Sequence, residues 1–96
     1  MNQTIFNAIR NMHVLSLTYN GIARMVEPHA YGVSKAGNDV LRCYQPVGGH
    51  IKPGHEWELL SVSEITALSD TQAKFSGARY GYSRDDKAMT RIYAQL

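Results

Sequence analysis

Residues 24–45 read RMVEPHAYGVSKAGNDVLRCYQ and contain two strand-like segments around a short turn. Strand-forming residues extend from 22 to 33 before the turn and from 40 to 47 after it. Between them, residues 34–38 are the small and polar types that favour a turn. The stretch therefore predicts two neighbouring strands joined by a tight connection.

A proline and an alternation of residue types shape this pair of strands. Pro28 cannot donate a hydrogen bond to a β-ladder, so we expect an edge or a bulge, and a bend, at this residue. On the second strand, Leu41 and Cys43 alternate with Arg42 and Tyr44. Because side chains alternate between the faces of a strand, one face should be core, with Cys43 buried, and the other should carry the cation and the phenol.

The segment before these strands predicts a helix and a hairpin. Apolar residues recur at spacings of four and three within 4–12, which makes one helical face apolar. Residues 14–19 are strand-like and are followed by Asn20-Gly21, the strongest short signal for a two-residue hairpin turn. We expect the returning strand to begin near Ile22.

The C-terminal third predicts two short strands and a final helix. Residues 57–62 and 65–68 are strand-like, whereas 69–82 show no regular pattern. Ser83 can cap a last helix, with Asp86 three residues on as a variant capping box, and an apolar stripe continues to the C-terminus. Five short strands between two terminal helices indicate an α+β chain with a small, strongly bent sheet or partly open barrel.

Length and composition are those of a single-domain globular protein. The 96 residues are 44% hydrophobic and 19% charged, which fits one domain spanning 1–96. No apolar run approaches the roughly 20 residues that span a bilayer, and the N-terminus lacks the cationic start and apolar run of a signal peptide. With its single cysteine, the chain is expected to be cytoplasmic, without a disulfide and without a membrane partner.

Basic residues are concentrated toward the C-terminus. Residues 74–96 carry five basic and two acidic side chains, a net +3, whereas residues 1–73 carry five basic and six acidic. This distribution favours phosphate-bearing partners, although solvated cations on a surface are the commoner reason for it.

Five residues of the opening stretch suit a flat, anionic ligand. Arg24 and Arg42 can fork onto a phosphate, and Tyr31 and Tyr44 can stack on a base. His29 can donate to the phosphate or accept a proton. The two arginines can converge across neighbouring strands if an anion lies between them. This chemistry favours binding over catalysis.

The same residues also have structural interpretations. Arg24 can pair with Glu27 or Glu58 at the surface, and the tyrosines can simply pack in the sheet. His29 can hydrogen-bond its own bend, and Trp57 is most simply a core anchor.

A second group of residues interleaves aromatic rings with cations. Tyr80 and Tyr82 lie beside Arg79 and Arg84 in the segment before the predicted last helix. Such interleaving is typical of nucleic-acid contacts, although the run is short.

No pattern predicts an enzyme, a cofactor or a metal site. His50 and His55 flank a glycine- and proline-rich loop, but further clustered ligands are missing. We find no Ser-His-Asp order, no phosphate-cradling glycine loop and no catalytic carboxylate pair, and Asp85-Asp86 suit a helix N-terminus. A small hydrolase using His29 is the weakest of the functions that remain.

Five stretches, taken in order, resemble the bacterial WYL domains, a family named for a Trp-Tyr-Leu tripeptide. The stretches are LSLTYNG at 15–21, RMVEPHAYG at 24–32, LRCYQ at 41–45, WELLSVSEI at 57–65 and FSGARYGY at 75–82. The chain looks most like small, free-standing members that lack the usual DNA-binding winged helix. Where the tripeptide would stand, this chain has Asp39-Val40-Leu41.

The resemblance implies an SH3-like or Sm-like β-barrel of about five strands, here with an N-terminal and a C-terminal helix. It also implies a regulatory module that senses nucleotides or single-stranded nucleic acid, and members with a winged helix are commonly homodimers. We therefore expect non-enzymatic ligand binding by Arg24, His29, Tyr31, Arg42, Tyr44 and Arg79, with Tyr80, Tyr82 and Arg84 as further nucleic-acid contacts. The alternative is an assembly subunit with no small ligand, which pairs with another chain through the Pro28 strand or the last helix.

Overall fold

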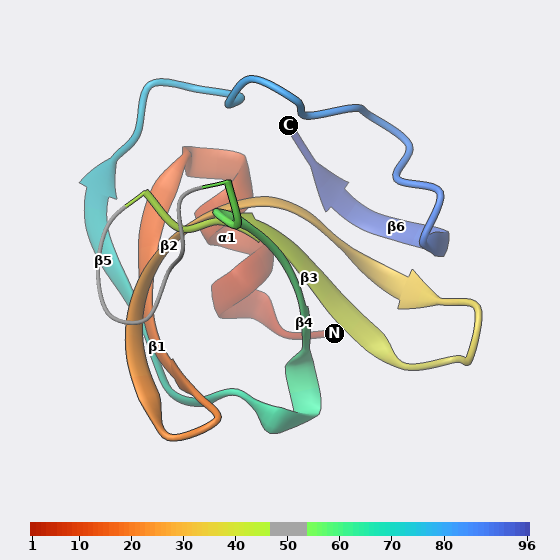
Figure 1. Ribbon diagram of the computed structural model, residues 1–96, viewed down its shortest axis with the longest axis horizontal. Helices are drawn as coiled ribbons and strands as arrows, with labels where there is room; N and C mark the ends of the chain where they lie inside the picture. The colour runs from red at the N-terminus through yellow and green to blue at the C-terminus, as the bar shows by residue number, and fades with distance from the viewer. Residues whose placement is uncertain (47–53) are drawn as a thin grey trace.

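The computed structural model describes residues 1–46 and 54–96, which form a helix, a short 3₁₀ turn and six strands (Figure 1). Val47 and most of the predicted glycine-rich loop, including His50, lie outside the described residues. The elements are α1 (Gln3–Asn11), β1 (His13–Tyr19), β2 (Ile22–Ser34), β3 (Asp39–Tyr44), β4 (Trp57–Ser61), η1 (Val62–Glu64), β5 (Thr66–Lys74) and β6 (Met89–Gln95).

The N-terminal helix is confirmed, and its ends have local causes. The Asn2 side chain accepts a hydrogen bond from the Ile5 N–H at 3.0 Å and caps the start of α1. Met12 adopts a left-handed conformation, with φ 55°, and ends the helix. Ile5, Ala8 and Ile9 form the buried face of α1.

All strands of the sheet are antiparallel, in the order β4-β3-β2-β1-β5, and β6 pairs with the remaining free length of β2. The predicted β1–β2 hairpin is confirmed: Asn20 and Gly21 both have positive φ, 53° and 73°. In the described residues no ladder joins β4 to β5, so the sheet is bent but not closed into a barrel. The prediction of a small α+β chain with a strongly bent sheet therefore holds at that level, with six strands in place of about five.

The predicted C-terminal helix is wrong, because its residues form strand β6. Gly32 of β2 lets β6 pack closely against β2, because a β-carbon at this position would collide with the Arg91 carbonyl and crowd Met89. The predicted capping box is instead a turn, in which an Asp86 carboxylate oxygen accepts a hydrogen bond from the Ala88 N–H at 2.9 Å. A long-range strand partner thus overrides the local helical pattern.

Strand β5 is also longer than the sequence pattern indicates. It extends to Lys74, through residues expected to be irregular, because it follows β1 with two register shifts. No helix in the described part of the chain is long and apolar enough to cross a membrane.

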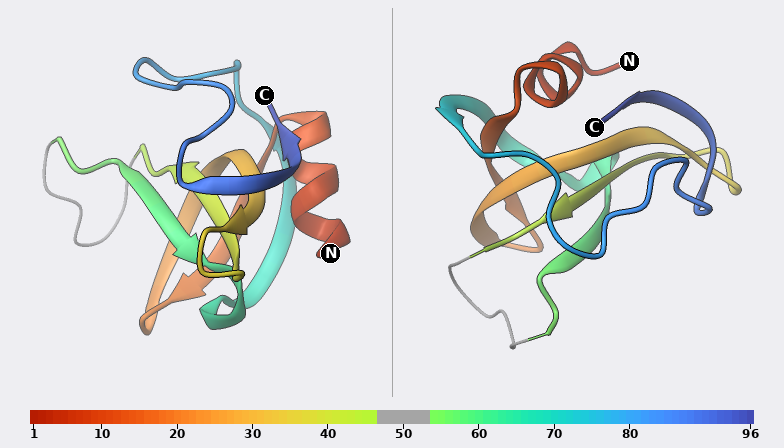
Figure 2. Two further views of the ribbon diagram at one scale, coloured as in Figure 1. Left: turned by 90° about the vertical axis from the view of Figure 1, so that its right-hand side faces the viewer. Right: turned by 90° about the horizontal axis from the view of Figure 1, so that it is seen from above.

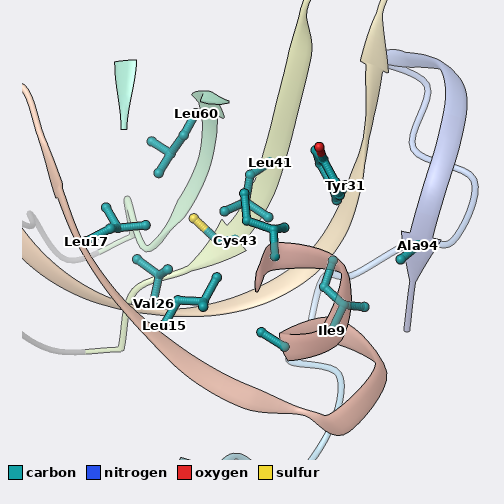
Figure 3. Packing of buried hydrophobic residues seen from close by; sticks show 11 residues of the cluster. Ile9, Leu15, Leu17, Val26, Tyr31, Leu41, Cys43, Leu60 and Ala94 are labelled. Atoms are coloured by element: carbon teal, nitrogen blue, oxygen red, sulfur yellow. The ribbon is translucent and has the colours of Figure 1, made fainter. Parts of the chain in front are cut away.

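The bent sheet buries side chains on both faces. On the first, which we call the core face, α1 covers a cluster from β1, β2, β3, β4 and β6 (Figure 3). Its members are Ile5, Ala8, Ile9, Leu15, Leu17, Val26, Tyr31, Leu41, Cys43, Leu60 and Ala94. Burial raises the pKa of the Cys43 thiol to about 12, as expected for an unreactive cysteine.

Residues 75–88, which we call the strap, connect β5 to β6 across the molecule (Figure 1). Seen from above, α1 and the strap lie on opposite sides of β2 (Figure 2). Tyr82 of the strap packs on a smaller cluster of Ala30, Val40 and Met89. The sheet surface beneath the strap, which we call the strap face, carries the residues of the candidate site.

Candidate functional site

A bulge in β2 places His29 beneath the strap. The ladder between β2 and β3 shifts register between Pro28 and Ala30, which confirms the predicted bulge. His29 is fully buried, and its Nδ1–H donates to the Glu27 carbonyl at 2.8 Å, so the histidine does bond its own bend. Its Nε2 accepts from the Arg79 N–H at 3.1 Å. Both ring nitrogens are satisfied by the neutral tautomer, and burial lowers the pKa of His29 below its ordinary value of 6.5.

Aromatic rings surround His29 and fix the strap to the sheet. The His29 ring centroid lies 4.8 Å from that of Trp57, 5.1 Å from that of Tyr82 and 5.7 Å from that of Phe75. Trp57 and Tyr82 are within 21° of parallel, with centroids 6.3 Å apart. Trp57 is half-buried at the edge of this cluster rather than in the main core, which was its expected place.

Arg79 connects the strap to β2 and β3. Its Nε–H and Nη2–H donate to the two carboxylate oxygens of Glu27 at 2.8 and 2.9 Å. Glu27 is buried, whereas the Arg79 side chain is 42% exposed. The guanidinium also lies 4.6 Å from the centre of the Tyr44 ring, which it covers. The charge of Arg79 is therefore already balanced within the chain.

Arg42 forms a second, similar connection. Its Nε–H donates to one carboxylate oxygen of Asp86 in the strap at 2.7 Å. Its Nη2–H donates to the other oxygen at 3.4 Å, so the pair is two-pronged. These hydrogen bonds lower the pKa of the Asp86 carboxyl below its ordinary value. Arg42, like Arg79, thus holds the strap in place.

A hollow of about 470 Å³ lies between the strap and strands β3 and β4, and we call it the strap hollow. It is lined by Arg42, Trp57, Gly81, Tyr82, Ser83, Arg84, Asp85, Asp86 and Lys87. Within the described residues, Arg84 and Lys87 form no ion pair and donate no side-chain hydrogen bond. The hollow therefore combines two aromatic rings with two uncommitted cations.

A shallower hollow of about 630 Å³ lies beside it, between Arg10 and β6. It shares Arg84, Asp85 and Asp86 with the strap hollow, but its aromatic lining is Tyr93 alone. Asp85 is held there by Gln95, whose amide donates to its carboxylate at 3.0 Å. We place the candidate site in the strap hollow because two aromatic rings, those of Trp57 and Tyr82, line that hollow.

Arg24 lies away from this site. It pairs in register with Leu17 of the main core, so it extends from the core face, whereas Arg42 extends from the strap face. Its guanidinium reaches Glu58 at 3.8 Å and lies 5.6 Å from the centre of the Tyr19 ring. The expected convergence of Arg24 and Arg42 does not occur, and the pairing with Glu58 is the interpretation that the structure supports.

Tyr31 is likewise removed from the surface. Its ring is fully buried in the main core, beside Tyr93 at 4.8 Å between centroids. The hydroxyl accepts from the Asn2 N–H at 2.6 Å and lies 3.3 Å from the carboxylate of Asp39, to which it donates. Tyr31 therefore stabilises the N-terminus of α1 and cannot stack on a ligand.

Of the nine residues expected to contact a ligand, three line the strap hollow: Arg42, Tyr82 and Arg84. His29, Tyr44 and Arg79 support its walls, Tyr80 lies next to it, and Arg24 and Tyr31 lie elsewhere. Sequence reasoning missed Trp57 and Lys87. The basic character of residues 74–96 was a signal for Lys87, whereas Trp57 comes to the site through the pairing of β4 with β3, which no local pattern indicated.

Residues 1–46 and 54–96 contain no group of three or more metal-ligating side chains. Comparisons of the chain with protein-family models, curated proteins and solved structures gave no match.

Proposed function

We propose that this chain is a non-enzymatic binding module that takes a nucleotide or a single-stranded nucleic acid in the strap hollow. One observation carries the proposal: Arg84 and Lys87, which have no partner among the described residues, line the same hollow as Trp57 and Tyr82. Cations that track a phosphate backbone, combined with rings on which bases stack, are the common features of single-strand binders.

The proposal divides the basic residues into two groups. Arg42 and Arg79 form two-pronged pairs with Asp86 and Glu27, so they hold the walls. Arg84 and Lys87 are free to bind phosphate. Catalysis is not part of the proposal, because both ring nitrogens of His29 are already committed to the backbone.

We also propose that the chain is a free-standing regulatory module of the WYL type, with a fold related to the small SH3-like and Sm-like barrels, in the cytoplasm. The order of the five sequence stretches supports this. The order of the structural elements also supports this proposal. A helix precedes five consecutive strands, β1 lies beside both β2 and β5, and a 3₁₀ turn lies between β4 and β5.

Binding of a labelled oligonucleotide, followed by fluorescence anisotropy, tests the proposal. Arg84→Ala and Lys87→Ala should each weaken binding severalfold, whereas Lys74→Ala removes the same charge at the end of β5 and should have little effect. If two phosphates are neutralised, log affinity should fall against log salt with a slope of about −1.4 for a single strand. No binding by the wild type, or equal losses in all three variants, would overturn the proposal.

The second candidate function is an assembly subunit without a small ligand. The Pro28 strand is unsuited to the role, because β2 already pairs with β1, β3 and β6. The described residues instead leave the outer edges of β4 and β5 open, and Leu59 on β4 is 37% exposed. Light scattering across a concentration series discriminates the two functions. A defined oligomer, such as a homodimer, without affinity for oligonucleotides would favour assembly.

A further inference from the structure

The strap holds the backbone of Tyr80 firmly and leaves its side chain entirely in solvent. The Trp57 indole N–H donates to the Tyr80 carbonyl at 3.3 Å. On either side, the Arg79 N–H donates to His29 and the Tyr82 N–H donates to the Arg79 carbonyl at 3.1 Å. The Tyr80 side chain is nevertheless 100% exposed. A large ring is thus presented to solvent by a backbone that is held by hydrogen bonds at Arg79, Tyr80 and Tyr82.

The two tyrosines of the strap face in different directions. Tyr82 lines the hollow, and its hydroxyl lies 3.3 Å from the Leu96 carbonyl. Gly81 between them has φ 92°, a conformation that L residues rarely adopt, and a β-carbon there would lie 3.3 Å from the Trp57 indole nitrogen. The glycine therefore allows one tyrosine to line the hollow while its neighbour extends outside it.

A free nucleotide and a strand would use this arrangement differently. A nucleoside monophosphate has one base and one phosphate group, which Trp57, Tyr82 and the two free cations can accommodate within the hollow. Such a ligand has no second base that could stack on Tyr80. Tyr80 is outside the lining of the hollow, but the hydrogen bond from Trp57 joins its backbone to that lining. Successive bases of a strand, by contrast, require successive stacking surfaces.

We propose that Tyr80 is a second stacking site, so that the ligand is a single strand of at least two nucleotides, with one base in the strap hollow and its neighbour on Tyr80. The inference rests on the proposed function, since it assumes that the hollow takes a base and a phosphate.

The test compares ligand lengths. Affinities for thymidine 5′-monophosphate and for tetrathymidylate, and for the uridine counterparts, are measured on the wild type, Tyr80→Ala and Tyr80→Phe. The wild type should bind the tetranucleotide at least about fivefold more tightly than the mononucleotide. Tyr80→Ala should bind the tetranucleotide about 5- to 100-fold more weakly, the loss expected when an aromatic ring that stacks on a base is removed. Its affinity for the mononucleotide should be unchanged. Tyr80→Phe should behave like the wild type, and the DNA and RNA arms show which strand is preferred.

The failure of this inference is distinguishable from failure of the proposed function. Equal affinity of the wild type for one and four nucleotides, or a tetranucleotide affinity that Tyr80→Ala leaves unchanged, would overturn the role of Tyr80 while binding in the hollow stands. Absence of binding for every ligand, or binding that Arg84→Ala leaves unchanged, would overturn both. Because the Tyr80 side chain is fully exposed, all variants should fold, which an unchanged melting temperature verifies.

Discussion

The two faces of the bent sheet are stabilised in different ways. The core face packs fully buried aliphatic side chains against α1. The strap face is held mainly by charge pairs, hydrogen bonds and half-buried rings, between the sheet and a segment without regular structure. Burial of apolar area stabilises without regard to direction, whereas the pairs on the strap face fix particular side chains in particular places. The candidate binding site lies on the strap face, where polar and aromatic side chains are held in place.

The largest expected effect separates the two faces with adjacent leucines of β4. Leu60 is 1% exposed in the main core, whereas Leu59 is 37% exposed on the opposite side of the strand. Leu60→Ala should lower the free energy of unfolding by about 2–5 kcal/mol through lost burial and a cavity. Leu59→Ala is the matched control and should cost less than about 1 kcal/mol. Urea denaturation measures both, and similar costs for the two would contradict the division into faces.

A smaller effect is expected when a strap contact is broken. Glu27→Gln should destabilise by about 1–2 kcal/mol, since bonds to charged groups contribute about 1.5–3 kcal/mol and solvent screens the partly exposed Arg79. Trypsin should then cleave faster after the basic residues of the strap. Glu58→Gln, which weakens the 3.8 Å pair with Arg24, should leave the cleavage rate unchanged. Equal cleavage of the two variants would show that the Glu27 pair does not hold the strap.

The strap face should also make stability depend on pH. The folded-state pKa of His29 lies below its ordinary 6.5, so the unfolded chain binds the extra proton more readily. The contribution of His29 is therefore full above pH 6.5 and is lost as the pH falls below it, by up to about 1.4 kcal/mol per pH unit. Among the charged groups that face the ring, Glu27 raises this pKa and Arg79 lowers it, both less than burial does.

Denaturation at pH 7, 6 and 5 measures the effect, with His29→Gln as the comparison. Asp86 acts in a different range, because its lowered pKa means that its contribution is lost only as the pH falls below its ordinary 3.8. The variant should therefore show a shallower slope between pH 6.5 and 5 than the wild type. Parallel slopes would mean that another group is responsible.

The smallest expected effect on stability is that of Tyr80. Because its side chain is 100% exposed, Tyr80→Ala should change the free energy of unfolding by less than about 0.5 kcal/mol. Tyr82→Ala, in contrast, removes a ring that packs on Ala30, Val40 and Met89 and should be clearly destabilising. Thermal melts of the two variants show whether Tyr82 supports the fold while Tyr80 does not.

Features with local causes could be predicted from the sequence. Asn20-Gly21 determines the β1–β2 turn because both residues tolerate positive φ, and Pro28 determines the bulge because it lacks an N–H. The alternation at Leu41 to Tyr44 correctly separated the two faces of β3.

Features that depend on distant partners could not be predicted. Residues 89–95 have a helical pattern, but the free length of β2 beside Gly32 makes them a strand. The pairing of Arg42 with Asp86 and of Arg79 with Glu27 joins residues more than 40 positions apart, and no local pattern indicates such pairs. The same long-range placement brought Trp57 and Lys87 into the candidate site and took Tyr31 out of it.

The fluorescence of Trp57 reports most directly on whether the ligand binds in the strap hollow. Trp57 is the only tryptophan of the chain and lines that hollow. Addition of a single-stranded oligonucleotide should quench its fluorescence in a saturable way, with the midpoint seen by anisotropy, and Arg84→Ala should shift both midpoints together. Binding detected by anisotropy without any change in Trp57 fluorescence would place the ligand elsewhere and contradict binding in the strap hollow.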